Sequence, residues 1–448
     1  MTPALAAIRF GTGLSPDIPP PADGAEVLDR LAGPDDAAVD VPILTWASMA
    51  PRAMRFNELR RKQDAPGGQA ALREHRIALN RTFHRDLART LARAATTHDG
   101  MRERLHWFWA DHFAVSDGGG VRRHTISAYH EDAIRPHMTG RFADLLFSAV
   151  THPAMLTYLD QHISAGPNSP RGRSGAGGLN ENLAREVLEL HTLGVGADYG
   201  QTDVRELAEL LTGLGVDKQG AYVFRPRFVE PGPENVLGRS YGGDRPNRHD
   251  IRAVLDDLSV HPATARHVSR KLATHFVADV PESSMVDAMA AAWARTDGDL
   301  MAVYAAMIDH PDAWSPELRK VRRPLDFMAA ALRATGAGSE IVSDTRGAIR
   351  DRLTFPLTRM GQPWLRPPGP QGWPEEAAAW ITPQGLAARL EWIADLVRRI
   401  DPAPDPRAFV HLALGDLAGP RTLFAAQAAE DRHAGLGLIL AAPEFQRR

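Results

Sequence analysis

The stretch GQAALREHRIALNRTFHRDLARTLARAATT, which covers residues 68–97, decides the fold class. Apolar residues recur along it at intervals of three and four, which is the spacing of one face of an α-helix. Ala71, Ile77, Phe83 and Leu91 mark that face. The same spacing, rich in alanine, continues through most of the 448 residues. We therefore predict a mainly α protein that forms a large multi-helix body.

Two segments interrupt the helical pattern. Residues 221–242 carry Tyr222-Val223-Phe224 and Val236-Leu237 on either side of Pro231-Gly232-Pro233, which favours one small β-hairpin or an extended loop. Residues 361–374, GQPWLRPPGPQGWP, cannot be helical, because proline breaks the backbone hydrogen-bond ladder. We expect an ordered Pro/Trp-rich loop there, packed on the helical body.

The hairpin divides the chain into parts that together form one compact unit. We expect an N-terminal helical half over residues 1–215, a β bridge over 216–242 and a C-terminal helical half over 243–448. Among the smaller elements we expect helices over 101–115 and 342–354, and a mobile loop rich in Gly, Ser and Pro over 164–179.

Composition excludes several classes of function. The 52 Lys and Arg face 55 Asp and Glu, and no block of like charge stands out, so we expect no nucleic-acid partner. The absence of cysteine excludes disulfides, thiolate zinc sites and iron–sulfur clusters. No stretch approaches the ~20 apolar residues of a membrane span. The residues after Met1 lack the features of a signal peptide, so the default location is the cytoplasm.

The segment from Glu181 to His191 is the first candidate for chemistry. On a helix, Asn182, Glu186 and Glu189 share one face, and such a row could bind a hard cation or act as an acid/base pair. Arg185 lies four residues from both Glu181 and Glu189, which is also the pattern of an ordinary solvated helix face. Both interpretations stay open at this point.

Two further segments carry polar residues in apolar surroundings. His106-Trp107-Phe108-Trp109-Ala110-Asp111-His112-Phe113 predicts a helix buried on most sides, in which Asp111 and His112 need internal partners. A buried histidine is more often a hydrogen-bonded core residue than a metal ligand. His152 begins a helix that ends at Asp160, and Asp160 directly precedes the Gly-rich loop, where it could face a cavity or solvent.

These strings together resemble the bacterial proteins known as domain of unknown function 1800. The resemblance starts at Arg9-Phe10-Gly11 and is most specific at Asn180–Glu186 with Glu189–Val195. It continues through His261–Ala265 and Gly372-Trp373-Pro374, so it covers nearly the whole chain. The family has no established activity. Its members are often exported and often encoded beside a sulfatase-related protein, which implies that protein as a partner and a cell-envelope or secreted polymer as a target.

The chain departs from the family pattern at three places. The usual His-Asp pair and the later Lys of the hairpin are replaced by Val229-Glu230 and by Glu234. The usual Trp after Leu211-Thr212-Gly213 is Leu214, and the usual Asn before His112 is Asp111. If the hairpin His or Lys serves the family's chemistry, this chain has lost or altered that chemistry.

Three functional hypotheses follow. The first is an enzyme that acts on the polymer and could use a divalent metal such as Mg, Mn, Fe or Zn. Its catalytic residues would be Glu186, Glu189, His112 and Asp160, its substrate-binding residues Arg185, Asn182, Trp109 and His152, and its metal ligands Glu186, Glu189 and His112. The second is a non-catalytic adaptor that binds a protein or glycan through an exposed aromatic patch around Trp364 and Trp373. The third is a degenerate family member with a regulatory role.

Overall fold

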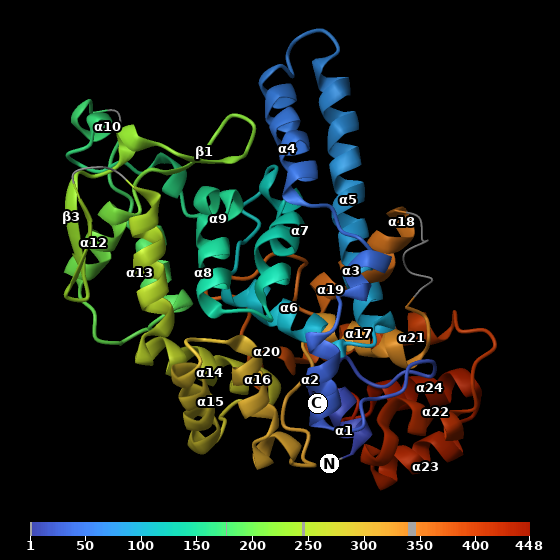
Figure 1. Ribbon diagram of the computed structural model, residues 1–448. Helices are drawn as coiled ribbons and strands as arrows, with labels where there is room; N and C mark the ends of the chain where they lie inside the picture. The colour runs from blue at the N-terminus through green and yellow to red at the C-terminus, as the bar shows by residue number, and fades with distance from the viewer. Residues whose placement is uncertain (1, 176, 244–246, 339–345) are drawn as a thin grey trace.

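The computed structural model describes residues 2–175, 177–243, 247–338 and 346–448, and it confirms a mainly α protein (Figure 1). Positions 342–345 of the predicted helix over 342–354, and position 176 of the Gly-rich loop, lie outside the described residues. Among the described residues, every helix is too short or too polar to cross a bilayer. The division of the chain at residues 215 and 243 stays a prediction.

The first half of the chain contains twelve α-helices in its described residues. They are α1 (Pro3–Arg9), α2 (Gly24–Ala32), α3 (Asp36–Asp40), α4 (Trp46–Arg61), α5 (Gly68–Thr96), α6 (Gly100–His112), α7 (Ile126–Tyr129), α8 (Phe142–Thr151), α9 (Pro153–Tyr158), α10 (Pro170–Arg173), α11 (Asn182–Glu186) and α12 (Gln201–Leu210). Two π-helical turns, η2 (His130–Ile134) and η5 (Val187–His191), continue α7 and α11.

After the β segment the chain returns to helices. They are α13 (Arg248–Val260), α14 (Pro262–Phe276), α15 (Ser283–Arg295), α16 (Leu300–Ile308), α17 (Pro324–Ala334), α18 (Arg346–Ile349), α19 (Phe355–Arg359), α20 (Ala377–Trp380), α21 (Pro383–Val397), α22 (Pro406–Leu414), α23 (Pro420–Ala428) and α24 (Arg432–Ala441). A third π-helical turn, η9 (Arg350–Thr354), joins α18 to α19.

The β segment forms two small hairpins where the sequence suggested one. β1 (Leu214–Val216) pairs antiparallel with β2 (Tyr222–Phe224), and β3 (Gly232–Val236) pairs with β4 (Arg239–Gly243). The second hairpin turns at Leu237-Gly238, and both residues have positive φ, 52° and 76°. Such a two-residue turn matches the twist of antiparallel strands, so β3 pairs forward to β4 and not back to β2.

Helix α6 lies between the two main hydrophobic clusters of the core. Phe108 and Trp109 pack in one cluster with α8 and α14–α16, while Trp107 packs in the other with α5, α17 and α21–α24. Every residue from Met101 to Trp109 is buried. A helix buried on all sides needs partners for its polar groups, and those of α6 decide where the candidate site lies.

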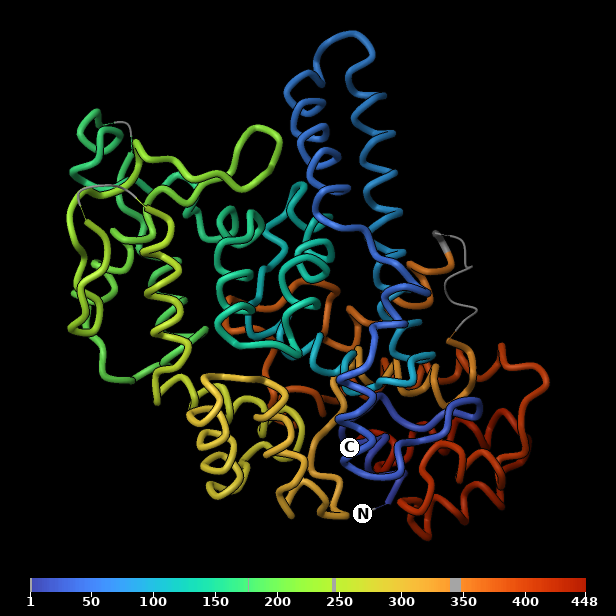
Figure 2. Tube along the Cα trace, in the orientation of Figure 1, coloured from blue at the N-terminus to red at the C-terminus, as the bar shows by residue number. Residues whose placement is uncertain are grey.

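Helices α4 and α5 form a two-helix arm that projects beyond the rest of the molecule (Figures 1 and 2). The prediction for residues 68–97 is confirmed by α5. Helix α4 was not expected, although Met49, Ala53 and Phe56 are buried at helical spacing along it. Pro51 within α4 obscures that signal.

The Pro/Trp loop is non-helical, as predicted, and is held against the C-terminal end of α6. The backbone N–H of Trp373 donates to Asp111 Oδ1 at 2.9 Å. Gly372 has φ +81°, and a Cβ there would lie 2.5 Å from the carbonyl oxygen of Asp111. Only glycine therefore allows the loop to approach α6 so closely.

We expect Tyr304→Phe to lower the free energy of unfolding by about 1–3 kcal/mol. The Tyr304 hydroxyl accepts a hydrogen bond from Trp109 Nε1 at 2.7 Å and donates to the carbonyl oxygen of Met138 at 2.8 Å. The substitution leaves both buried groups unpaired. Urea unfolding checks the value, with the half-buried Tyr222→Phe as the matched control. Equal losses in both variants would contradict the assignment.

Candidate functional site

A cavity of about 70 Å³ lies where α6 meets the Pro/Trp loop. Its wall draws on α6, the π-helical turn η2, the start of α17, the loop and the last residue of the chain. Residues of this wall that matter below are Arg104, His106, Trp107, Asp111, Arg323, Asp326, Trp364, Trp373 and Arg448. The cavity thus joins two segments that the sequence singled out separately, the aromatic helix and the Pro/Trp loop.

Three arginines approach Asp326, a buried carboxylate of the cavity wall. Arg448 Nη1 lies 2.8 Å from Asp326, Arg322 Nη1 lies 3.5 Å from it and Arg104 Nη1 lies 3.8 Å from it. Burial, followed by the repulsion of Arg448, holds the pKa of Arg104 well below its usual range. Because arginine does not give up its proton in proteins, this shift means that the wall favours additional negative charge.

A chain of charged groups leads from this wall to the Pro/Trp loop. Arg104 Nη2 donates to His275 Nε2 at 3.0 Å, so His275 carries its proton on Nδ1, which lies 2.6 Å from Glu375 Oε1. Arg323 Nη1 then bonds Asp111 Oδ2 at 2.6 Å. The expectation that Asp111 needs internal partners is met by Arg323 and by the N–H of Trp373.

Four buried N–H groups of the cavity wall make no hydrogen bond to any described atom. They are Trp107 Nε1, Trp364 Nε1, Arg104 Nε and Arg448 Nε. Buried donors in proteins are nearly always paired, with protein or with a molecule held in the cavity. A fifth unpaired buried atom of the wall, Nδ1 of His106, donates or accepts according to the tautomer of the ring. A molecule complementary to the four donors presents acceptor oxygens.

The far wall carries two neutral histidines. His106 and His130 pack edge to face with ring centroids 5.8 Å apart. Burial lowers the pKa of His130 to about 3 and that of His106 well below its usual range. Glu131 beside them is held by both guanidinium nitrogens of Arg93, at 2.7 and 2.9 Å. This side of the cavity therefore adds no free negative charge.

The row of polar residues predicted from the sequence lies on α11 and η5, away from the cavity wall. Arg185 bonds Glu181 at 3.2 Å and Glu189 at 3.4 Å, which is the ion-pair pattern of a helix face. Glu186 is half-buried, and burial together with the charge of Glu189 raises its pKa to about 6. Asn182 is exposed at the start of α11.

The other predicted site residues are dispersed. His112 is buried, and its Nε2 donates to the carbonyl oxygen of His191 at 3.1 Å. Trp109 donates to Tyr304, and His152 Nδ1 caps α9 by accepting from the N–H of Ala154 at 3.1 Å. Asp160 is exposed, with a left-handed φ of 56°. The structure brings Glu186, Glu189 and Arg185 together and leaves these four elsewhere.

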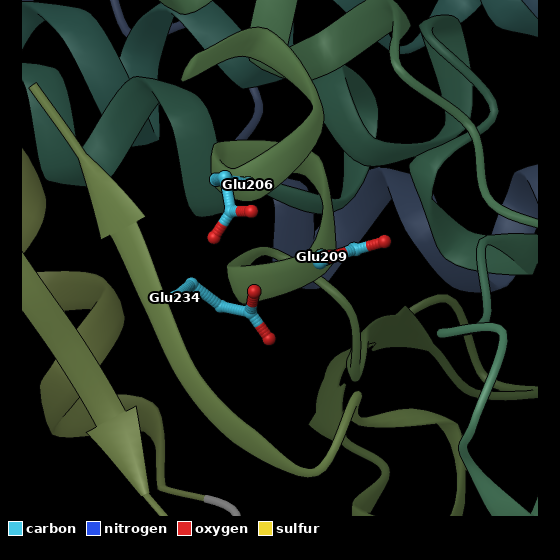
Figure 3. A group of neighbouring side chains, drawn as sticks. All are labelled: Glu206, Glu209 and Glu234. Atoms are coloured by element: carbon cyan, nitrogen blue, oxygen red, sulfur yellow. The ribbon is translucent and has the colours of Figure 1, made fainter. Parts of the chain in front are cut away.

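One trio of potential metal ligands exists among the described residues, and it is a different one. Glu206 and Glu209 of α12 face Glu234 of β3, with one carboxylate oxygen of each within 4.8 Å of the others (Figure 3). Glu234 is 6% exposed, and burial and the two neighbouring charges raise its pKa to about 8. Metal binding by Glu186, Glu189 and His112, which form no such trio in the described chain, stays a prediction.

Fold and cavity define a helical protein with a donor-rich pocket at the junction of two core clusters. The chain belongs to the family described as Protein of unknown function (DUF1800), whose model matches residues 9–447. This match confirms the resemblance inferred from the sequence motifs. The comparison with curated proteins and the comparison with solved structures give no match.

We expect Glu234→Gln to stabilise the protein at alkaline pH. A carboxyl whose pKa is raised on folding contributes stability below its unfolded pKa, near 4.5, and loses it as the pH rises through the folded value, about 8. The variant removes this loss, so its unfolding free energy at pH 9 should exceed that of the parent by on the order of 1–3 kcal/mol.

Urea unfolding at pH 5 and pH 9 measures this difference, which should shrink at the lower pH. Glu74→Gln, at an exposed position of α5, is the control and should leave the pH dependence unchanged. A Glu234→Gln variant with the parent's pH dependence would show that the cluster is not protonated in the folded state.

Proposed function

We propose that the protein binds a small molecule bearing a carboxylate or a similar oxyanion in the central cavity. The observation that carries this proposal is the set of four unpaired buried donors in the cavity wall. The wall combines apolar side chains, three tryptophans and several charged groups. Apolar and aromatic side chains with convergent polar groups are the usual lining of a small-molecule site. The cell-envelope or secreted polymer implied by the family resemblance is a source of such a molecule, as an acidic unit or end group.

The character of the donors supports an anion over a neutral ligand. Arg104 and Arg448 supply guanidinium N–H groups, which suit carboxylate or phosphate oxygens. Trp107 and Trp364 add neutral N–H donors that fix the orientation of the ligand. A buried anion also offsets the repulsion between Arg104 and Arg448 near Asp326.

The positions of the loop tryptophans favour a pocket protein over the adaptor hypothesis. The adaptor interpretation expects an exposed aromatic patch around Trp364 and Trp373. Both side chains are half-buried and both line the cavity. Tryptophans that line the cavity support the pocket hypothesis over the adaptor hypothesis. A regulatory role for this family member stays a prediction.

Ligand binding is expected to quench tryptophan fluorescence and raise the melting temperature. The probes are acetate, malonate, glucuronate and inorganic phosphate, with acetamide as the neutral counterpart. Trp107→Phe keeps an aromatic ring, smaller than the indole, and removes one donor. Affinity for the best anion should therefore fall roughly tenfold or more, as for a lost hydrogen bond to a charged group.

Trp314→Phe is the matched control, because the Trp314 N–H donates to the carbonyl oxygen of Ile308, outside the cavity wall. It should bind like the parent protein. If none of the anions binds, or if Trp107→Phe binds as tightly as the parent, the proposal fails.

Proton transfer at Glu186 is a second candidate function, favoured by a pKa of about 6. A half-buried carboxyl that titrates near neutral pH can both donate and accept a proton. Burial, followed by the charge of Glu186, raises the pKa of Tyr158 at the end of α9, so a tyrosine hydroxyl lies near Glu186. The charge of Arg185 lowers the pKa of Glu186 and so limits the rise that burial and Glu189 cause.

We expect Glu186 to titrate near pH 6 by carbon NMR of glutamate carboxyl groups. Assignment uses the loss of the resonance in Glu186→Gln. In Glu189→Gln the midpoint should move down toward the ordinary glutamate value, because the charge that raises it is gone. Titration of Glu186 at the ordinary value in the parent protein would remove the basis for this second function.

A further inference from the structure

The two-helix arm carries a charge opposite to that of the remaining chain. The chain as a whole has a formal charge of −3. Between residues 52 and 85, nine Arg and Lys side chains are exposed, against three acidic ones, Glu58, Asp64 and Glu74. Sequence inspection found no block of like charge, because these cations are spaced along two helices and become neighbours only when α4 packs on α5.

Few of the arm's cations are neutralised within the arm. On α4 and its C-terminal cap, Glu58 pairs with Arg55 at 2.6 Å and with Lys62 at 2.8 Å. Arg60 and Arg61 are exposed and make no ion pair with any described carboxylate. The arm thus presents guanidinium groups to solvent, where they are available to an anionic partner.

Helix α5 adds further cations to the same charged surface. Arg73, Arg76, Arg81 and Arg85 of α5 are all exposed. His75 Nε2 bonds the carbonyl oxygen of Arg52 at 2.8 Å and so fastens α5 to α4. The cations are therefore held on a packed two-helix scaffold, and not on a loose tail.

A groove lies along this charged surface, between α4 and the β1–β2 turn. Its volume is about 1230 Å³. Arg55, Arg60 and Arg61 line one side and Lys218 the other, with Glu58 as the one acidic residue of the wall. The turn is fixed to α4, because Trp46 Nε1 donates to the carbonyl oxygen of Gly220 at 2.8 Å.

We propose that this groove and arm bind a single chain of an acidic polysaccharide. Among the described residues, no aromatic side chain lines the groove, so the bases of a single-stranded nucleic acid find no ring there on which to stack. It does offer amides, from Asn57, Gln63 and Gln219, beside the arginines, which suit hydroxyl groups next to carboxylates.

Membrane binding fits the arm less well. The loop at its tip is Asp64-Ala65-Pro66-Gly67, without an aromatic or large aliphatic residue to enter a bilayer. Phe56 and Phe83 are buried within the molecule. The surface therefore attracts a soluble polyanion by charge and holds it in the groove.

The test is binding of a labelled oligogalacturonate to the full chain by fluorescence anisotropy. Neutral dextran, oligo-dT and duplex DNA are the comparison ligands. We expect oligogalacturonate to bind more tightly than any of them, with an affinity that falls as salt rises. The triple variant Arg55→Gln/Arg60→Gln/Arg61→Gln should lose roughly tenfold or more in affinity, because three charges facing the ligand are removed.

The matched control removes the same charge elsewhere, in Arg295→Gln/Arg407→Gln/Arg421→Gln, whose residues are exposed and outside the arm. It should bind like the parent, because its three arginines lie outside the groove. Thermal unfolding confirms that each variant folds. Tighter binding of either nucleic acid, equal loss in both triple variants, or no binding of oligogalacturonate would overturn the proposal.

Discussion

A single buried carboxylate, Asp326, is the group around which the core is arranged. Arg104 of α6, Arg322 before α17 and Arg448 at the last residue all approach it. Each of these charges is too costly to bury without an opposite charge nearby, so the three segments fix one another's positions. Arg104 and Arg448 of this cluster also line the cavity. The electrostatic need that orders the core thus also gives the pocket its preference for an anion.

Long, regular patterns were predictable, and short or interrupted ones were not. The apolar stripe of residues 68–97 has no competing interpretation, and α5 follows it closely. Helix α4 has a weaker stripe broken by Pro51, so the arm could not be foreseen. In the β segment the Pro-Gly-Pro sequence was the obvious turn. The second hairpin instead turns at Leu237-Gly238, where both residues have positive φ.

For the candidate site, too, contacts between residues close in the chain were predictable, and contacts between distant residues were not. The ion pairs of Arg185 with Glu181 and Glu189 are four residues apart, and helical geometry alone predicts them. The sequence also indicates that Asp111 needs an internal partner. Nothing in it says that this partner is Arg323, 212 positions away. The cavity depends on several such long-range pairings, which only the folded chain reveals.

The position of α6 in the chain has a consequence for the order in which the protein folds during synthesis. Arg104 and Asp111 leave the ribosome early, yet the groups that compensate their charges, Asp326 and Arg323, emerge more than 200 residues later. Until then, burial of α6 between its two hydrophobic clusters would strand unpaired charges. Complete burial of α6 is therefore expected only after Arg323 and Asp326 have been synthesised.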